Sequence, residues 1–491
     1  MEEENPAEIG ISEFGASTAK GSLIFTSSKV LSAIVTLALL IFLARVLKPA
    51  DYGLYAIVVA FSTTLHASGN FGMATAMRKK LPQLKSLHDK FLTLSSAYAM
   101  SLAVTALVVI AGVAISGLLA VYAYNDSALQ FPLEIGAVMV LFSVMFNLSI
   151  SALIGIGKVA GSSISVIVYS AVQLIAVVIF VLMGFGIVGA LLGTVLGLLA
   201  GFIVAIAYTL KYIGFEFVKP TKAEMGELGK FTLPLVVSGI SVNGSKSIAV
   251  LVLGIFASSF IVGEYNAAFR LGSFAEVIIT SLAFMLLPAF SKAFVNEGLA
   301  KRLSSIFNSS IYYTLLFMLP IIAYVASTAK PLIYLFFSSA YSFTPPYFIA
   351  IVIGITIGII GNYGSNIIIG YGDTKRTTKY QLTVVAVELL LLVALTPFIK
   401  VYGVLVSVFI VGPLVMDAIY ISALKKSFNI SLDYRQLALL VAASIVLLAV
   451  LYIPSVLIHG KKLLLVDAVL AFLAYPIIAG ELHAVRKKNL E

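Results

Sequence analysis

The chain of 491 residues contains no cysteine and few charged residues. Without cysteine it can form no disulfide, and thiolate metal sites and cysteine nucleophiles are excluded. Charged residues make up 11% of the chain, whereas soluble proteins average about 25%. Hydrophobic residues make up 60%, and the mean hydropathy is +1.08. This composition excludes a soluble protein and indicates a membrane protein.

The first twenty residues, "MEEENPAEIGISEFGASTAK", are acidic and lack the features of a secretory signal peptide. Such a peptide begins with basic residues and ends at a small-residue cleavage site. Because both features are missing, we expect the first apolar run to be retained as a membrane helix.

Apolar runs long enough to cross a membrane recur from residue 21 almost to the C-terminus. Backbone groups inside lipid must be paired within their own segment, and no alternating β-barrel pattern is visible. The sequence therefore predicts an all-α polytopic membrane protein. Turn signals and charge clusters divide it into about fourteen transmembrane helices, at residues 21–47, 52–77, 91–121, 132–156, 159–183, 186–211, 231–257, 260–291, 305–328, 345–370, 377–398, 401–424, 435–454 and 463–482.

The basic residues predict the orientation. If the N-terminus is cytoplasmic, 23 of the 32 lysines and arginines fall in inside segments and five in outside segments. Because cytoplasmic loops carry an excess of basic residues, both termini are predicted to lie on the cytoplasmic side of the cytoplasmic membrane. The formal charge of +10 then reflects topology and attraction to anionic lipid head groups, and does not indicate a nucleic-acid partner.

The two halves of the chain resemble each other. The segments "ADYGLYAIVVAF" and "GEYNAAFRLGSF" place Tyr52 and Tyr265 213 positions apart, and "IGIGKVAGSS" and "IGYGDTKRTT" place Gly157 and Gly372 215 positions apart. A duplication into two parallel repeats of six spans is predicted, an arrangement that in transporters usually encloses a central site. The predicted domains are a cytoplasmic tail (1–20), a first lobe (21–212), a cytoplasmic linker with a short interfacial helix (213–230), a second lobe (231–424) and two C-terminal helices with a basic tail (425–491).

At these segments the sequence resembles the polysaccharide or O-antigen flippase branch of the multidrug/oligosaccharidyl-lipid/polysaccharide exporter superfamily. "LARVLKPADYGLYAIV" is similar to that family's junction between helices one and two, "GEYNAAFRL" to the start of helix eight, "AKPLIYLFFSSAYSFTPPYF" to the segment between helices nine and ten, and "IIIGYGDTKRTTKY" to the turn between helices ten and eleven. Lys48 departs from the family pattern, in which a glycine is usual before the proline. The resemblance implies two six-helix lobes, a central cavity open to one leaflet at a time, and two extra C-terminal helices.

Polar side chains within the spans fall on three helical faces, and each face carries a cation. The candidates for binding substrate on these faces are Lys29 in the first span, Asn243 and Lys246 in the seventh, and Asn266, Arg270 and Ser273 in the eighth. Because a charge at the bilayer centre costs about 2.5–3.5 kcal/mol, we expect these faces to line protein or water. Arg270 is predicted to bind phosphate, since its planar fork of donors matches phosphate oxygens.

A structural ion pair is the alternative role for the membrane cations. Arg270 and Glu276 lie about 240° apart on one helix and cannot pair directly, whereas Glu276 can meet Lys246 from the neighbouring helix. The acids Glu276, Glu388 and Asp417 are candidates for proton or sodium coupling, and a paired or cavity-edge carboxylate is the alternative for each.

Other motifs give no catalytic or cofactor site. "GISVNGSKS", residues 239–247, has the glycine and lysine of a phosphate-binding loop, but the spacing is wrong and no strand precedes it. We therefore predict no nucleotide, cofactor or metal. His66 in the second span is interpreted as a hydrogen-bonded helix contact rather than a proton relay.

Three functional classes fit a protein of this kind. A flippase for a lipid-linked oligosaccharide or polysaccharide precursor requires cations for the polyprenyl phosphate or pyrophosphate, and a wet cavity, because an unpaired sugar hydroxyl costs roughly 4–8 kcal/mol. An ion-coupled multidrug (MATE-type) exporter requires carboxylates in its lobes, and the first span has none. A membrane glycosyltransferase or ligase requires an outer catalytic domain, and the predicted outer loops are short. We predict a transporter that is not an enzyme, whose partners are a lipid-linked glycan and membrane lipids. H+ and Na+ are the candidate ions for coupling, and the membrane potential alone is the alternative.

Overall fold

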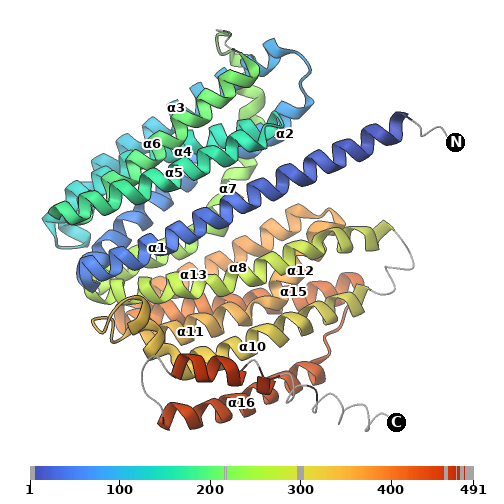
Figure 1. The fold of residues 1–491 in the computed structure, drawn as a ribbon. Helices are drawn as coiled ribbons and strands as arrows, with labels where there is room; N and C mark the ends of the chain where they lie inside the picture. Colours follow the sequence, from blue (N-terminus) through green and yellow to red (C-terminus); the bar gives the residue numbers. More distant parts are fainter. Residues whose placement is uncertain are drawn as a thin grey trace. The chain divides into compact units, whose positions relative to one another are not determined.

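The structure, a computed structural model, describes residues 6–214, 216, 218–295, 303–457, 463–471, 473–475 and 480 (Figure 1). Helices form all the regular structure of these ranges, and no β-strand occurs within them. The predicted all-α class is confirmed. Helical hydrogen bonding is what lets a long apolar run satisfy its backbone groups in lipid.

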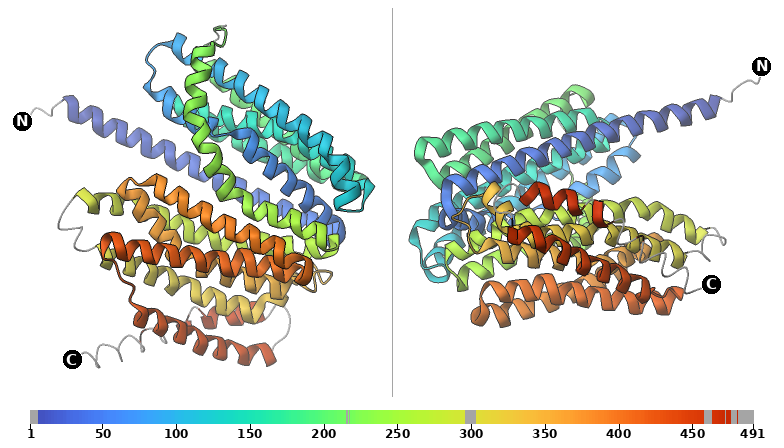
Figure 2. Two further views of the ribbon diagram at one scale, coloured as in Figure 1. Left: turned by 180° about the vertical axis from the view of Figure 1, so that it is seen from behind. Right: turned by 60° about the horizontal axis from the view of Figure 1, so that its bottom comes forward.

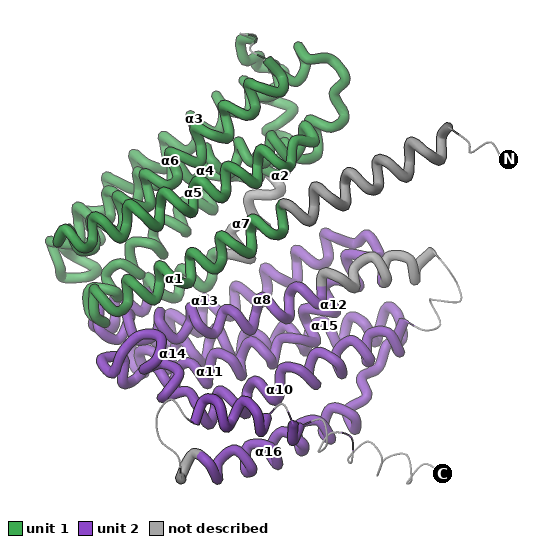
Figure 3. Tube along the Cα trace, in the orientation of Figure 1, with its two compact units in different colours: residues 1–251 green, residues 252–491 purple. Residues whose placement is uncertain are grey.

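The chain divides into two compact units, residues 1–251 and 252–491 (Figure 3). The division falls inside helix α7 (Lys222–Phe256). The limits inferred from the sequence for lobes, linker and tail stay a prediction.

The first unit contains six helices and most of α7, namely α1 (Pro6–Asn70), α2 (Met73–Lys80), α3 (Leu87–Leu118), α4 (Gln130–Gly155), α5 (Val159–Phe180) and α6 (Gly186–Ile213). α4 packs against α1, α2, α3 and α6, and α5 packs against α1 and α6. The contact between α5 and α6 is close: a Cβ at Gly193 would lie 2.5 Å from the backbone nitrogen of Val177. Small residues of this kind let membrane helices gain van der Waals contact. His66 of α1 lies 2.7 Å from the hydroxyl of Ser143 on α4, which agrees with its interpretation as a helix contact.

The second unit contains the remaining helices, namely α8 (Ser259–Val295), α10 (Leu303–Phe336), α11 (Thr344–Ile357), α12 (Ile359–Tyr371), α13 (Thr374–Ile399), α14 (Val401–Val404), α15 (Gly412–Phe428), α16 (Tyr434–Leu457) and helical residues 463–471 and 473–475. α8 packs against α11 and α12, and α12 packs against α15. Ala323 of α10 is buried in a cluster with Leu447 of α16 and Tyr475, so the red end of the chain in Figure 2 is part of this unit.

The described helices support several membrane crossings. Nine helical segments of the described residues are long and apolar enough to span a membrane, and Gly244–Phe256 and Leu463–Tyr475 are shorter apolar helices. The chain is therefore a multi-pass membrane protein. Three predicted spans have a different local form from the one expected. The first two run together as α1, which has a non-helical residue at Lys48 (φ 61°, ψ 170°), and the tenth is broken at Gly358 into α11 and α12.

The internal repeat predicted from the sequence is visible in the backbone. Gly157 after α4 (φ 78°) and Gly372 after α12 (φ 98°) are both left-handed. Each donates its N–H to the carbonyl three residues earlier, at 3.0 and 2.9 Å respectively. Glycine takes this helix-ending conformation without strain, which accounts for its presence in both halves. Tyr52 and Tyr265, the other matched pair, are both fully buried.

The segment predicted as a linker is partly attached to the first unit. Within the predicted linker (213–230), residues 222–230 form the first turns of α7. Leu228 is 1% exposed and packs with Met77 of α2, Leu94 of α3 and Leu148 of α4. Burying such a side chain contributes roughly 1.5–3 kcal/mol, which holds the start of α7 on this unit.

Candidate functional site

Three of the predicted binding residues, Asn266, Arg270 and Ser273, lie on one face of α8 in the second unit. Asn266 is 3% exposed, whereas Arg270 and Ser273 are half-buried. The Ser273 hydroxyl donates to the backbone carbonyl of Arg270 at 2.7 Å. Its proton is therefore used within the helix, and the donors left for a ligand on this face are those of Asn266 and Arg270.

Arg270 has an unused buried donor. Its Nε–H has no hydrogen-bond acceptor, and no carboxylate pairs with its guanidinium, among the residues that the structure describes. Its Cζ lies 6.0 Å from the ring centroid of Phe269. Gly272 contacts Ile351 of α11, since a Cβ there would lie 2.6 Å from Ile351 Cγ2. Arg270 is about 200° around α8 from Gly272, so it faces away from α11. A buried donor left unpaired costs roughly 1–3 kcal/mol, so an anionic ligand on this face would remove a penalty.

The other predicted binding residues are placed less fully. Lys29 on α1 is exposed, with its Nζ 5.4 Å from the ring centroid of Phe25. Lys246 is half-buried on α7, in the first unit, and the side chain of Asn243 lies outside the described part. Glu276, a candidate for coupling, is half-buried on α8. The substrate and coupling roles of these residues stay predictions.

The two other candidate acids are buried at helix contacts in the second unit. Glu388 of α13 is 9% exposed and packs on Gly412, where a Cβ would lie 2.7 Å from its Cγ. Asp417 of α15 is 7% exposed and accepts the backbone N–H of Gly361 at 2.6 Å. Gly361 lies in the first turn of α12, which begins after Gly358. Asp417 therefore supplies an acceptor to a half-helix whose first N–H groups have no helical partner.

Sequence reasoning missed Glu264, which is fully buried near the start of α8. The Thr344 hydroxyl at the start of α11 donates to its carboxylate. The signal was present, because Glu264 stands in the segment "GEYNAAFRL" that also contains Arg270.

Among the described residues all buried carboxylates lie in the second unit: Glu264, Glu388, Asp417 and Asp467. No three His, Asp or Glu side chains of the described ranges gather as a metal site.

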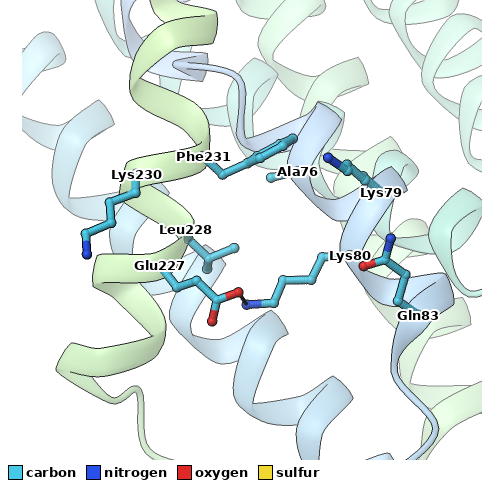
Figure 4. Close-up of a pocket in the computed structure, with 8 residues that line it drawn as sticks. All are labelled: Ala76, Lys79, Lys80, Gln83, Glu227, Leu228, Lys230 and Phe231. Carbon is cyan, nitrogen blue, oxygen red and sulfur yellow. Dashed lines mark ion pairs between the residues drawn. The ribbon is translucent and has the colours of Figure 1, made fainter.

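A pocket of about 380 Å³ lies between α2 and α7 in the first unit (Figure 4). Lys80 reaches across it to the carboxylates of Glu224 and Glu227, with both Nζ–Oε1 distances 2.9 Å. Thr93 of α3 donates to Glu224 at 2.7 Å. Two carboxylates neutralise Lys80, so these residues form an ion-paired joint between α2, α3 and α7.

The pKa values of this joint follow from the same contacts. Burial lowers the pKa of Lys80, but its hydrogen bonds to Glu224 and Glu227 outweigh burial, so its pKa is raised. Burial raises the pKa of Glu224, but the hydrogen bonds from Lys80 and Thr93 outweigh it, so its pKa is lowered. Both groups are therefore charged at neutral pH.

Comparison with known protein families shows which family this chain belongs to. The family model described as "Polysaccharide biosynthesis protein" matches residues 18–294, more than half of the chain. The chain belongs to the polysaccharide biosynthesis protein family. This confirms the resemblance drawn from the sequence. A comparison with curated proteins finds no match.

Solved structures share the fold of this polysaccharide biosynthesis protein. "Lipid II flippase MurJ, inward closed conformation" has a TM-score of 0.78 at 16% identity, over 95% of this chain and 99% of that chain. An inward-facing multidrug resistance MATE family transporter of the MOP superfamily has a TM-score of 0.62 at 17% identity, over 82% and 99%. A MOP superfamily transporter from Pyrococcus furiosus has a TM-score of 0.55 at 18% identity, over 84% and 95%. The fold of this superfamily, as implied by the resemblance, is confirmed.

Proposed function

We propose that this chain moves a lipid-linked oligosaccharide or polysaccharide precursor across the cytoplasmic membrane by alternating access. The observation that carries the proposal is Arg270, a cation in the eighth predicted span whose buried Nε–H has no hydrogen-bond acceptor among the described residues. A phosphate or pyrophosphate oxygen supplies the missing acceptor and the opposite charge. The family match and the fold shared with a protein named as a lipid II flippase support this substrate class.

The proposed site combines a phosphate ligand with groups for sugar. In the second unit, Arg270 binds the phosphate of the carrier, and Asn266 hydrogen-bonds sugar hydroxyls, which lose water on entering the site. Lys29, Asn243 and Lys246 belong to the first unit, and their roles in binding the substrate stay predictions. A membrane potential that is negative inside favours outward movement of an anionic head group by about 2.3 kcal/mol per charge per 100 mV.

The test is flipping of a polyprenyl-pyrophosphate-linked oligosaccharide by purified protein in liposomes. Arg270→Ala is expected to abolish flipping. Arg270→Lys keeps the charge but loses one bond of the fork, worth about 1.5–3 kcal/mol, and should slow flipping about tenfold or more. Both variants should unfold at the temperature of the wild type.

Two results would contradict this role. Flipping at the wild-type rate by folded Arg270→Ala would show that the guanidinium is not needed. A lower unfolding temperature for Arg270→Ala, restored by neutralising a second buried residue, would show that Arg270 is a structural ion-pair partner.

An ion-coupled drug exporter is the second candidate. The buried acids Glu388 and Asp417 favour it, together with the fold shared with a MATE family transporter. Against the exporter, the described part of the first unit contains no buried carboxylate. Efflux of a cationic dye from vesicles under a proton or sodium gradient, at a rate unaffected by Arg270→Ala, would favour the exporter over the flippase.

A further inference from the structure

An open pocket of about 760 Å³ lies in the second unit, between the first turns of α13 and the last turns of α15. Arg376 and Tyr380 line it from α13, and Lys426 and Ser427 line it from α15. No acidic side chain lines it. The pocket is separate from the face of α8 that carries Arg270, and the proposed flipping mechanism does not use it.

The guanidinium of Arg376 is held in a fixed position at this pocket. Its Nε donates to the hydroxyl of Tyr380 at 2.7 Å, and its Nη1 donates to the hydroxyl of Ser427 at 2.8 Å. Tyr380 packs edge-on against the ring of Tyr420, 5.5 Å between centroids, which holds that hydroxyl in place. Arg376 has further N–H donors beyond these two, and no carboxylate pairs with it among the described residues.

The charge at the pocket is positive. Lys426 is exposed beside Arg376. The acid nearest in sequence to Arg376 is Asp373, whose carboxylate accepts the backbone N–H of Arg376 at 3.1 Å and so caps α13. Two cations and the hydroxyl groups of Tyr380 and Ser427 form the donor set that phosphate oxygens take.

The pocket also changes polarity along its length. On α15, Ala418 and Ile419 line one end, and Lys426 and Ser427 line the other. Eight or nine helical residues cover about 12–14 Å, which is the scale of a phospholipid head group with the first carbons of its chains. A free anion would use the polar end alone and gain nothing from the apolar end.

We propose that this pocket binds the phosphate of an anionic membrane lipid. Arg376 and Lys426 hold the phosphate, and the glycerol and first acyl carbons lie along Ala418 and Ile419. Basic pockets between membrane helices at the cytoplasmic side are known to take such head groups. The basic residues here belong to segments predicted to be cytoplasmic.

The test uses the absence of tryptophan from the chain. Ile419→Trp places a single indole at the apolar end of the pocket. The full chain is placed in nanodiscs with brominated phosphatidylglycerol or brominated phosphatidylcholine, and quenching of the indole is measured. Phosphatidylglycerol is expected to quench at about fivefold lower mole fraction, because a nearby Lys or Arg contributes about 1 kcal/mol toward an anionic lipid.

The matched control is Lys425, an exposed lysine next to Lys426 that does not line the pocket. In the Ile419→Trp background, Lys426→Gln should remove most of the preference for phosphatidylglycerol, and Lys425→Gln should keep it. Arg376→Lys should weaken it in part. Equal effects of Lys426→Gln and Lys425→Gln, or no preference for phosphatidylglycerol at all, would overturn the proposal.

A separate arm distinguishes lipid from free phosphate. Inorganic phosphate is added to the nanodiscs at constant ionic strength. If the pocket takes a lipid, quenching by brominated phosphatidylglycerol is unchanged. Reversal of quenching by inorganic phosphate would show a site for a soluble anion and would also overturn the proposal.

Discussion

At the scale of a residue, the backbone of Lys48 explains why glycine is usual at this position in the family. Its backbone (φ 61°, ψ 170°) lies in a region that is essentially restricted to glycine and costs other residues about 1–3 kcal/mol. Lys48→Gly should therefore raise the free energy of unfolding by about 1 kcal/mol, after the greater freedom of glycine in the unfolded chain is subtracted. Thermal unfolding in detergent measures this. Lys48→Ala removes the charge but keeps the Cβ, so an equal gain in that variant would contradict a backbone cause.

Asp417 and Glu388 are both buried acids, but their surroundings predict different effects. Asp417→Asn keeps an oxygen for the N–H of Gly361, so it should fold and transport nearly as the wild type does. Asp417→Ala leaves that N–H unpaired and should cost about 1–3 kcal/mol of stability.

Glu388→Gln should reduce transport more than Asp417→Asn if Glu388 couples an ion. Transport by Glu388→Gln at the wild-type rate would remove that acid from the mechanism.

At the scale of elements, the ion-paired joint of α2, α3 and α7 yields a matched pair of variants. Glu224 has a side chain 13% exposed, whereas that of Glu227 is 70% exposed. Glu224→Gln should destabilise the protein by about 1–3 kcal/mol, because it weakens charged hydrogen bonds to Lys80 and Thr93. Glu227→Gln should change stability by less than about 0.5 kcal/mol, since solvent screens that pair. Similar losses in the two variants would contradict this assignment.

The ion-paired joint also predicts how the stability of the folded protein depends on pH. The pKa of Glu224 is lowered from 4.5, so its contribution is fully present above pH 4.5 and is lost as the pH falls through the lowered pKa. The pKa of Lys80 is raised from 10.5, so its contribution is present below pH 10.5 and is lost as the pH rises through the raised pKa. The stability difference between wild type and Glu224→Gln should therefore be constant through neutral pH and shrink toward acid. A difference that grows below pH 4.5 would contradict the sign.

At the scale of the whole molecule, the orientation of the chain in the membrane can be tested by labelling introduced cysteines. The chain has no cysteine of its own that would react with the label. Asp126→Cys, between α3 and α4, should react with an impermeant maleimide added outside cells. Lys85→Cys, between α2 and α3 and exposed in the structure, should react after the membrane is opened. The reverse pattern would overturn the prediction that both termini are cytoplasmic.

The arrangement of helices along the chain was largely predictable from the sequence. The predicted span 159–183 corresponds to α5 (Val159–Phe180), and 377–398 corresponds to α13 (Thr374–Ile399). The break at Gly358 was not predicted, because an apolar run has the same hydropathy whether or not the helix is interrupted. The start of α7 at Lys222 was not predicted, because charged residues surround Leu228 in the sequence, whereas in the structure Leu228 packs on the first unit.

The sequence alone determined the fold class, the order of the membrane helices and the duplication. These depend on local quantities, namely the length of apolar runs and the pairing of each backbone group within its own helix. The tertiary structure decided what the polar residues contact. Asp417 meets Gly361 across 56 positions, and Thr93 meets Glu224 across 131. Pairing of this kind depends on the register between packed helices, and hydropathy does not encode register. For the same reason, the sequence could place Arg270 on a polar face, and the structure was needed to show that its buried donor has no partner among the described residues.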